Sequence, residues 1–260
     1  MAKLTSKDGT LIAYEKSGSG FPVILVDGAM CSRDFGPMIK LGPLLAEQFT
    51  VFNYDRRGRN ESGDTQPYAP EREIEDIEAL ITEAGGSAYV YGISSGAALS
   101  LAAVAKGLNI TKLALYEPPF ELPGATDGAP KDMLTQLKTM VAEDRRGDAV
   151  KYFMKVVGVP SFGIFMMTLL PIWKKLKAIA HTLPYDITLL DGFTLPEERA
   201  KAVMIPTLVA AGTKTSELLK KSVKRLSELI PNNQYKMLNG QTHNVSEKAI
   251  APVLIEFFKG

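Results

Sequence analysis

Six short apolar runs, separated by segments with helical periodicity, most constrain what this chain can fold into. They read as strands over residues 22–28, 49–55, 88–94, 112–118, 206–212 and 234–240. Several runs are apolar at consecutive positions, as expected for strands that are buried on both faces of a sheet. Because strands that alternate with helices form mostly parallel sheets, the pattern predicts an α/β fold with a helix-covered central sheet.

One long interval, residues 122–195, breaks this alternation. It has helical periodicity at Met133, Leu137 and Met140 and a cluster of Met, Phe and Trp residues, but no convincing strand. Because it lies between two core strands, we expect it to form a helical cap over one end of the sheet. The sequence therefore predicts a core of residues 1–121 and 196–260 with an inserted cap of residues 122–195.

The composition narrows the class of partner. Hydrophobic residues make up 45% of the 260 positions, which is ample for a core. The 30 basic and 29 acidic side chains are mixed along the sequence and give a formal net charge of +1, so we expect no nucleic-acid partner and no anionic membrane partner. The single cysteine, Cys31, excludes an internal disulfide and a cysteine-rich zinc site. A cytoplasmic location follows as the default, since a lone cysteine fits a reducing compartment.

The sequence also gives no sign of membrane insertion. Residues 1–20 alternate polar and apolar side chains and lack the apolar centre of a signal peptide. The most apolar run, residues 162–173, is interrupted by a glycine and a proline and is far shorter than the roughly 20 residues that span a bilayer. We therefore expect neither a signal peptide nor a transmembrane segment.

The segment from Tyr89 to Ala105 carries the strongest chemical signal. Gly92-Ile93-Ser94-Ser95-Gly96 fits the G-x-S-x-G pattern, with a strand before it and a helix after it. A sharp turn of this kind strains the backbone of a nucleophile, and the flanking glycines remove side chains that would collide there. The alternative is an unreactive Gly/Ser-rich turn. The strand and helix on either side favour a nucleophile elbow that presents Ser94 at the carboxyl edge of the sheet.

A serine hydroxyl needs a base to remove its proton, and the sequence offers two histidines. His181 lies in the expected cap, where packing or lining is its simplest role. His243 lies in the loop between the last strand and the last helix, where the chain returns to the carboxyl edge of the sheet. We therefore expect His243 to be the general base.

At these landmarks the chain resembles the α/β-hydrolase fold superfamily over nearly its whole length. The matching stretches are "ILVDGAMCSRDF" for the oxyanion loop, "NYDRRGRNESG", "GISSGAALS" for the elbow and "NGQTHN" for the histidine loop. Two departures stand out. The oxyanion loop reads Asp27-Gly28 where the family usually has His-Gly, and the loop after "PTLVAAG", which usually bears the acid of the triad, bears none.

The acid must therefore come from elsewhere. Glu117 follows the strand next to the elbow strand in the usual order of this fold, about 4.8 Å away, and its apolar surroundings would penalise an unpaired carboxylate. The alternatives are an acid from the cap (Asp186 or Asp191), a Glu117 that only caps its loop or pairs with an arginine of "DRRGR", or no acid at all. If Glu117 is the acid, the hydroxyls of residues 213–216 would serve only to cap the helix that starts near Ser216.

The finer resemblance is to the zearalenone-lactonase branch of the superfamily. That branch has Asp-Gly in the oxyanion loop, an "SSGA" elbow, a glutamate after the next strand and a Thr/Ser-rich loop in place of the usual acid. This chain has "VDGAMC", "GISSGAA", "YEPPFELP", "AGTKTSE" and "GQTHN" in the same order. The resemblance implies that Glu117 orients His243, and it does not extend to the cap.

An oxyanion hole needs backbone N–H groups, so the residue before the glycine need not take part. We expect one donor from Ser95 and the other from Gly28 or Ala29. Asp27 would orient this loop through hydrogen bonds to nearby N–H groups, and Cys31 would be a small buried side chain.

Together these features predict a serine hydrolase that cleaves a small apolar carboxylic ester or lactone through an acyl-enzyme, without metal or cofactor. The candidate pocket residues are Cys31, Phe162, Met166, Trp173 and Tyr185, although the cap residues among them could equally seal the cap onto the core. Two other classes stay open: a ligand-binding or sensor protein with little turnover, and an enzyme that uses the triad for carbon–carbon cleavage, cyanohydrin lysis or perhydrolysis.

Overall fold

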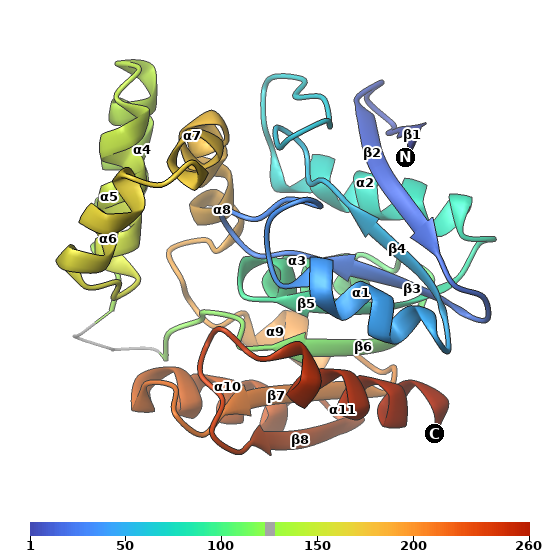
Figure 1. The fold of residues 1–260 in the computed structure, drawn as a ribbon. Coiled ribbons are helices and arrows are strands. Elements are labelled where there is room, and N and C mark those ends of the chain that lie inside the picture. The colour runs from blue at the N-terminus through green and yellow to red at the C-terminus, as the bar shows by residue number, and fades with distance from the viewer. Residues whose placement is uncertain (123–127) are drawn as a thin grey trace.

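An eight-stranded sheet forms the centre of the protein in this computed structural model, which describes residues 1–122 and 128–260 (Figure 1). The strands lie in the order β1-β2-β4-β3-β5-β6-β7-β8. Their bounds are β1 (Ala2–Thr5), β2 (Leu11–Ser17), β3 (Pro22–Val26), β4 (Thr50–Tyr54), β5 (Ala88–Ile93), β6 (Ile110–Tyr116), β7 (Thr207–Gly212) and β8 (Asn233–Leu238). The six strands from β3 to β8 are those expected from the apolar runs, and they pair in parallel, whereas β1 and β2 add an antiparallel edge. The predicted α/β fold is confirmed.

Helices cover both faces of the sheet because successive strand residues point to opposite sides. Apolar side chains on one face pack against α1 (Met38–Ala46) and α11 (Glu247–Lys259). Those on the other face pack against α2 (Pro70–Glu83), α3 (Ser95–Ala105), α9 (Glu197–Lys201) and α10 (Glu217–Leu229). In β5, for example, Val90 belongs to the second layer and Tyr91 to the first. Burial on both faces fixes the register of each strand.

The expected cap interval is helical in its described residues. It contains α4 (Met133–Ala142), α5 (Arg146–Val156), α6 (Ser161–Thr168), α7 (Ile172–Ala178), a 3₁₀ turn (Ala180–Thr182) and α8 (Leu183–Leu189). These helices stand beside the sheet at the left of Figure 1. A parallel bridge between Glu121 and Thr194 joins the two ends of the interval. None of the described helices is long and apolar enough to cross a membrane.

The helices α4 to α8, which are called the cap below, have an apolar core of their own that includes Leu137, Val150 and Leu183. One member comes from outside the cap. Met30, in the loop after β3, is buried in this cluster and has a left-handed backbone with φ of 62°. The loop that was expected to carry the oxyanion donors is therefore packed directly into the cap.

Candidate active site

Ser94 lies on the sharp turn between β5 and α3 and has φ of 55° and ψ of −128°. A non-glycine residue rarely adopts such a backbone, so the turn is strained as expected of an elbow. Its N–H donates to the Tyr116 carbonyl at 2.9 Å, which ties the turn to β6. Only glycine fits at position 96, because a Cβ there would lie 2.2 Å from the Val26 carbonyl oxygen. The sequence motif thus forms the local geometry that it predicts.

Glu117 and His243 meet at the same edge of the sheet. Oε2 of Glu117 lies 2.8 Å from Nδ1 of His243. Glu117 is fully buried immediately after β6, whereas the His243 side chain, in the loop between β8 and α11, is 43% exposed. A carboxylate only accepts hydrogen bonds, so this contact favours the imidazole tautomer with its proton on Nδ1 and leaves Nε2 free to act as a base.

The end of β7 and the loop that follows it, which bears no acid, donate hydrogen bonds to the carboxylate of Glu117. Oε1 of Glu117 accepts from the Gly212 N–H at 2.7 Å, and Oε2 accepts from the Thr215 hydroxyl at 2.9 Å. Ser216 caps α10, since its Oγ accepts from the Leu219 N–H at 3.3 Å. The expectation that these hydroxyls serve only as helix caps is therefore wrong for Thr215, which is within reach of the buried carboxylate because β7 lies next to β6.

Neither cap aspartate contacts His243. Asp186 is buried against Arg56 and Arg59, and Asp191 is exposed at the end of α8. Among the described residues, no hydrogen bond joins Ser94 to His243. Catalytic hydrogen bonds are often long before substrate binds. The structure thus brings Glu117 and His243 into contact and presents Ser94 at the end of the neighbouring strand.

The three candidate oxyanion residues surround the elbow. A Cβ on Gly28 would lie 3.0 Å from Cβ and 3.6 Å from Oγ of Ser94, so this backbone passes directly beside the candidate nucleophile. The Gly28 carbonyl accepts from Nη1 of Arg59 at 2.6 Å. Because a trans peptide places its C=O and N–H on opposite sides, the Ala29 N–H faces away from that arginine. Ser95 begins α3, where its N–H has no partner within the helix.

Asp27 does not have the hydrogen bonds that were expected of it. It is buried, and neither carboxylate oxygen meets the geometry of a hydrogen bond to a described residue, although the Gly28 N–H is close enough to lower its pKa. Burial raises the pKa of Asp27 to about 7, against the opposing charges of Arg59 and Arg56. Its Oδ2 lies beside Gly36, where a Cβ would be 3.2 Å from it. Asp27 is thus a poorly solvated carboxyl group beneath the loop.

The candidate pocket residues do not gather in one place. Phe162 is 75% exposed and Met166 42% exposed on α6, so both lie on the surface of the cap. Trp173 lines a groove on the cap's outer side with Gly147 and Lys177. These three placements correct the expectation of a shared apolar pocket. On α6 most apolar side chains are exposed and only Ile164 is buried, whereas Trp173 of α7 is partly buried against the apolar cluster of these helices.

The remaining two candidates also have other contacts. Tyr185 stacks on Tyr68 with ring centroids 3.9 Å apart, and its hydroxyl donates to Asp64 at 3.0 Å. It therefore joins the cap to the loop after β4 rather than lining a pocket with α6. Cys31 is half-buried beside Gly36, and its carbonyl accepts from Arg59. Burial raises the pKa of the Cys31 thiol, so it is a poor nucleophile.

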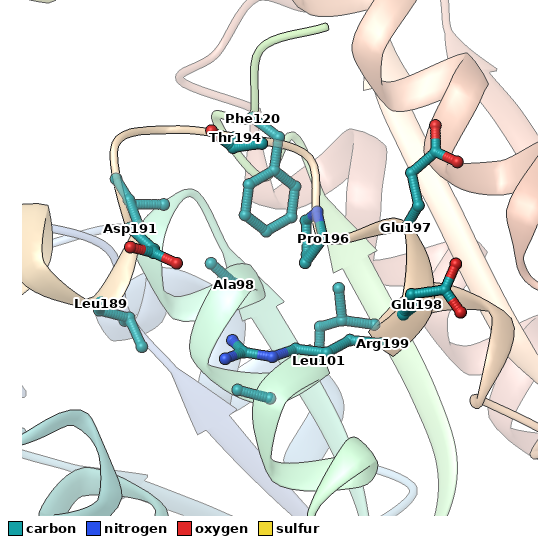
Figure 2. A pocket seen from close by; sticks show the side chains of 12 residues that line it. Ala98, Leu101, Phe120, Leu189, Asp191, Thr194, Pro196, Glu197, Glu198 and Arg199 are labelled. Carbon is teal, nitrogen blue, oxygen red and sulfur yellow. The ribbon is translucent and has the colours of Figure 1, made fainter. Parts of the chain in front are cut away.

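A cavity of about 270 Å³ lies on the flank of α3, away from these groups (Figure 2). Its walls include Ala98 and Leu101 of α3, Phe120, Asp191 and Arg199. Neither Ser94, Glu117 nor His243 lines it, so it is separate from the candidate site. Within residues 1–122 and 128–260, no group of three or more His, Cys, Asp or Glu side chains could hold a metal ion.

The sheet order, the strained serine turn and the histidine loop define the class of protein. Residues 18–249 match the family model described as the alpha/beta hydrolase family, and the chain belongs to that family. An alpha/beta hydrolase from Sphaerobacter thermophilus DSM 20745 is 49% identical, with 99% of this chain and 100% of that one covered and a TM-score of 0.92. No curated protein matches the sequence.

More distant structures share the fold alone. A bromoperoxidase from Bacillus anthracis is 21% identical with a TM-score of 0.75, and both chains are covered in full. A thermophilic esterase from Thermogutta terrifontis is 19% identical with a TM-score of 0.71, with 99% of this chain and 97% of that one covered. One fold thus carries proteins with different activities, so the chemistry depends on the residues of the site.

Proposed function

We propose that this protein is a serine hydrolase that cleaves carboxylic esters or lactones through an acyl-enzyme. The observation that carries the proposal is the 2.8 Å contact between Oε2 of the buried Glu117 and Nδ1 of His243, next to the strained Ser94 turn. A base oriented by a carboxylate beside an activated serine is the arrangement that acyl transfer requires. The esterase among the structural neighbours agrees with this class of reaction.

In the proposed reaction, Oγ of Ser94 attacks the carbonyl carbon while Nε2 of His243 takes its proton. The N–H of Ser95 and that of Gly28 or Ala29 would hold the negative oxygen of the tetrahedral intermediate. The intermediate then expels the alkoxide, which receives the proton from His243, and Ser94 is left acylated. Water, deprotonated by His243, attacks the ester in the same way and releases the acid.

The Glu117 side chain would orient the imidazole and stabilise the imidazolium formed in each half-reaction. Its other acceptor positions are filled by the Gly212 N–H and the Thr215 hydroxyl, which support the negative charge in a buried site. A lactone would follow the same steps, with the leaving alkoxide still attached to the acyl chain. The product would then be a single hydroxy acid.

The test is turnover of p-nitrophenyl acetate and p-nitrophenyl butyrate by wild type and Ser94→Ala, with intact-mass analysis after treatment with a fluorophosphonate. We expect hydrolysis and one covalent adduct in wild type and neither in the variant. Wild type that shows no turnover and no adduct contradicts the proposal and favours a binding protein. Because the catalytic landmarks resemble the zearalenone-lactonase branch, zearalenone and δ-valerolactone are the lactones to compare with the esters.

A further inference from the structure

One buried cap carboxylate accepts hydrogen bonds from three side chains of the core. Asp186 of α8 is 1% exposed. Its Oδ1 accepts from Nη1 of Arg56 at 2.8 Å, from Nη2 of Arg59 at 2.9 Å and from Oγ of Ser95 at 2.7 Å. Its Oδ2 accepts from Nη2 of Arg59 at 2.8 Å. This cluster is the most extensive polar contact between the cap and the start of α3.

The same two arginines hold the backbone of the loop opposite Ser95. Arg59 donates through Nη1 to the carbonyls of Gly28 at 2.6 Å and Cys31 at 3.2 Å. Arg56 donates through Nη1 to the Asp27 carbonyl at 3.2 Å. One carboxylate is therefore connected to both segments that would supply oxyanion donors: directly to Ser95 on one side, and through the arginines to Gly28 on the other.

The cluster is nearly balanced in charge. Arg56 also forms a bidentate pair with Glu73 at 2.6 and 2.8 Å, so two guanidinium groups face two carboxylates. Burial by itself would raise the pKa of Asp186, but the charges of Arg59 and Arg56 outweigh it and hold that pKa below its usual range. Asp186 is thus an ionised group in a dry site, where its hydrogen bonds resist rearrangement.

Buried ion pairs contribute little net stability, because desolvation offsets most of their attraction. The ion pairs do, however, fix the geometry of the groups they hold, and an apolar replacement would not. Each carbonyl that the arginines hold fixes the plane of its peptide, and therefore the direction of the N–H on the other side. Ser95 is held through its own side chain, which limits how α3 can tilt at its first turn.

We propose that Asp186 is a positioning residue of the oxyanion hole, through which the docked cap sets the donor peptides of Ser95 and Gly28. The inference rests on the proposed function, since it assigns a role in stabilising the tetrahedral intermediate. Met30 provides a second attachment of the same loop, because its side chain belongs to the apolar core of the cap. A cap displaced from Asp186's partners would leave the substrate bound beside Ser94 with poorly aimed donors.

The expected signature is a loss of kcat with little change in KM, since misplaced donors weaken binding of the transition state more than that of the substrate. Removing one oxyanion donor outright costs about 10² to 10³ in rate. We expect about 10-fold for Ser95→Ala, which keeps its N–H but loses the bond that its hydroxyl donates to Asp186 and the bond that it accepts from Arg56, and about 100-fold for Asp186→Asn. Because the two changes break one network, the double variant should be no slower than about twice Asp186→Asn.

Asp76→Asn is the matched control. Asp76 is buried and forms a bidentate pair with Arg57 at 2.7 and 2.8 Å, but neither residue contacts Ser95 or the Gly28 loop. This variant should lose thermal stability as Asp186→Asn does and keep a kcat near that of wild type in assays well below its melting temperature. Ser95→Ala removes only a hydroxyl, so it tests the inference even where Asp186→Asn does not fold.

The assay is p-nitrophenyl butyrate hydrolysis, together with the rate of labelling of Ser94 by a fluorophosphonate, which also needs a stabilised oxyanion. Wild type that neither hydrolyses nor labels would contradict the proposed function itself. Wild type that does both, with Ser95→Ala and any folded Asp186→Asn at wild-type kcat, would overturn only the positioning role. A kcat loss equal in Asp76→Asn and Asp186→Asn would also overturn it, because the effect would then be one of stability.

Discussion

At the scale of single residues, the carboxylate of Glu117 is notable because each of its hydrogen-bond partners among the described residues is a donor. The Gly212 N–H, the Thr215 hydroxyl and Nδ1 of His243 surround its two oxygens. These bonds fix the position of the buried carboxylate beside the imidazole. Thr215 therefore acts on the histidine indirectly, by holding the group that would orient it.

Thr215→Val should lower kcat by about 10-fold, because a hydrogen bond to a charged group is worth roughly 1.5 kcal/mol and about 1.4 kcal/mol corresponds to a tenfold change in rate. The measurement is kcat for p-nitrophenyl butyrate. Thr213→Val is the matched control, since the Thr213 hydroxyl accepts only from the Gly240 N–H at 2.8 Å. Equal losses in the two variants would mean that the loop's fold, and not the bond to Glu117, sets the effect.

Asp27 gives a prediction about stability and pH. Its pKa of about 7 in the folded protein exceeds the value of roughly 3.9 in an unfolded chain. The folded state therefore binds more protons between these values, and Asp27 lowers the free energy of unfolding as pH rises from about 4 to about 7. Asp27→Asn removes this dependence, because an amide does not titrate.

We therefore expect the stability of Asp27→Asn relative to wild type to improve by about 1 to 4 kcal/mol between pH 4.5 and pH 7.5. Urea unfolding at the two pH values measures it, and the comparison cancels the constant cost of burying an amide. A difference between variant and wild type that does not change with pH would show that Asp27 titrates in its ordinary range.

At the scale of elements, the turn into α3 depends on a helix that packs against backbone. Gly96 is the second residue of α3, and Gly147 is the second residue of α5. A Cβ at position 96 would meet the Val26 carbonyl at 2.2 Å, whereas at position 147 its nearest neighbour is the Trp173 side chain at 3.6 Å. The same residue type at the same helix position thus has opposite tolerance.

Gly96→Ala should lower the melting temperature by about 10 °C or more, or prevent folding, because overpacking against rigid backbone costs several kcal/mol. Gly147→Ala should be neutral or slightly stabilising, since alanine favours helix. Differential scanning calorimetry of both variants measures the contrast. Similar melting temperatures for the two would contradict the close approach of α3 to β3.

The strands and the elbow could be predicted from sequence because burial and turn chemistry leave local patterns. Ser94, His243 and Glu117 stand out as candidates in this way, because they follow the ends of strands that the apolar runs mark. The directions in which the cap side chains point could not be predicted from the sequence. α6 is apolar on nearly every side, so periodicity does not tell which face is inward, and only Ile164 of its residues is buried.

At the scale of the whole molecule, the order of strands explains which strand ends could supply the acid that orients the histidine. β6 lies between β5, which ends at the candidate nucleophile, and β7, whose loop usually bears the acid. Ile93 pairs with Tyr116, so Ser94 and Glu117 follow directly paired residues. Moving the acid by one strand therefore keeps it within reach of the histidine loop and of the donors at the end of β7.

The buried partners of Arg56 and Arg59 could not be predicted from one sequence. Three arginines directly after a buried strand indicate that buried partners exist, but Asp186 lies 130 positions from Arg56 along the chain. No local pattern identifies such a partner, and Asp186 was considered only as an alternative acid. The position of Asp186 depends on how the cap docks, which the sheet pattern does not encode.

The most direct test of whether Glu117 orients His243 for catalysis is to measure kcat of Glu117→Gln with p-nitrophenyl butyrate. Asp191→Asn, which changes an exposed cap carboxylate, is the control. The hydrogen-bond partners of the Glu117 side chain among the described residues are all donors. The glutamine amide of the variant must therefore turn its NH₂ group toward one of them, and the imidazole loses its orientation. We expect kcat to fall about 10² to 10⁴-fold in Glu117→Gln and to stay near wild type in Asp191→Asn. A folded Glu117→Gln with wild-type kcat would contradict the central claim that Glu117 orients His243 for catalysis.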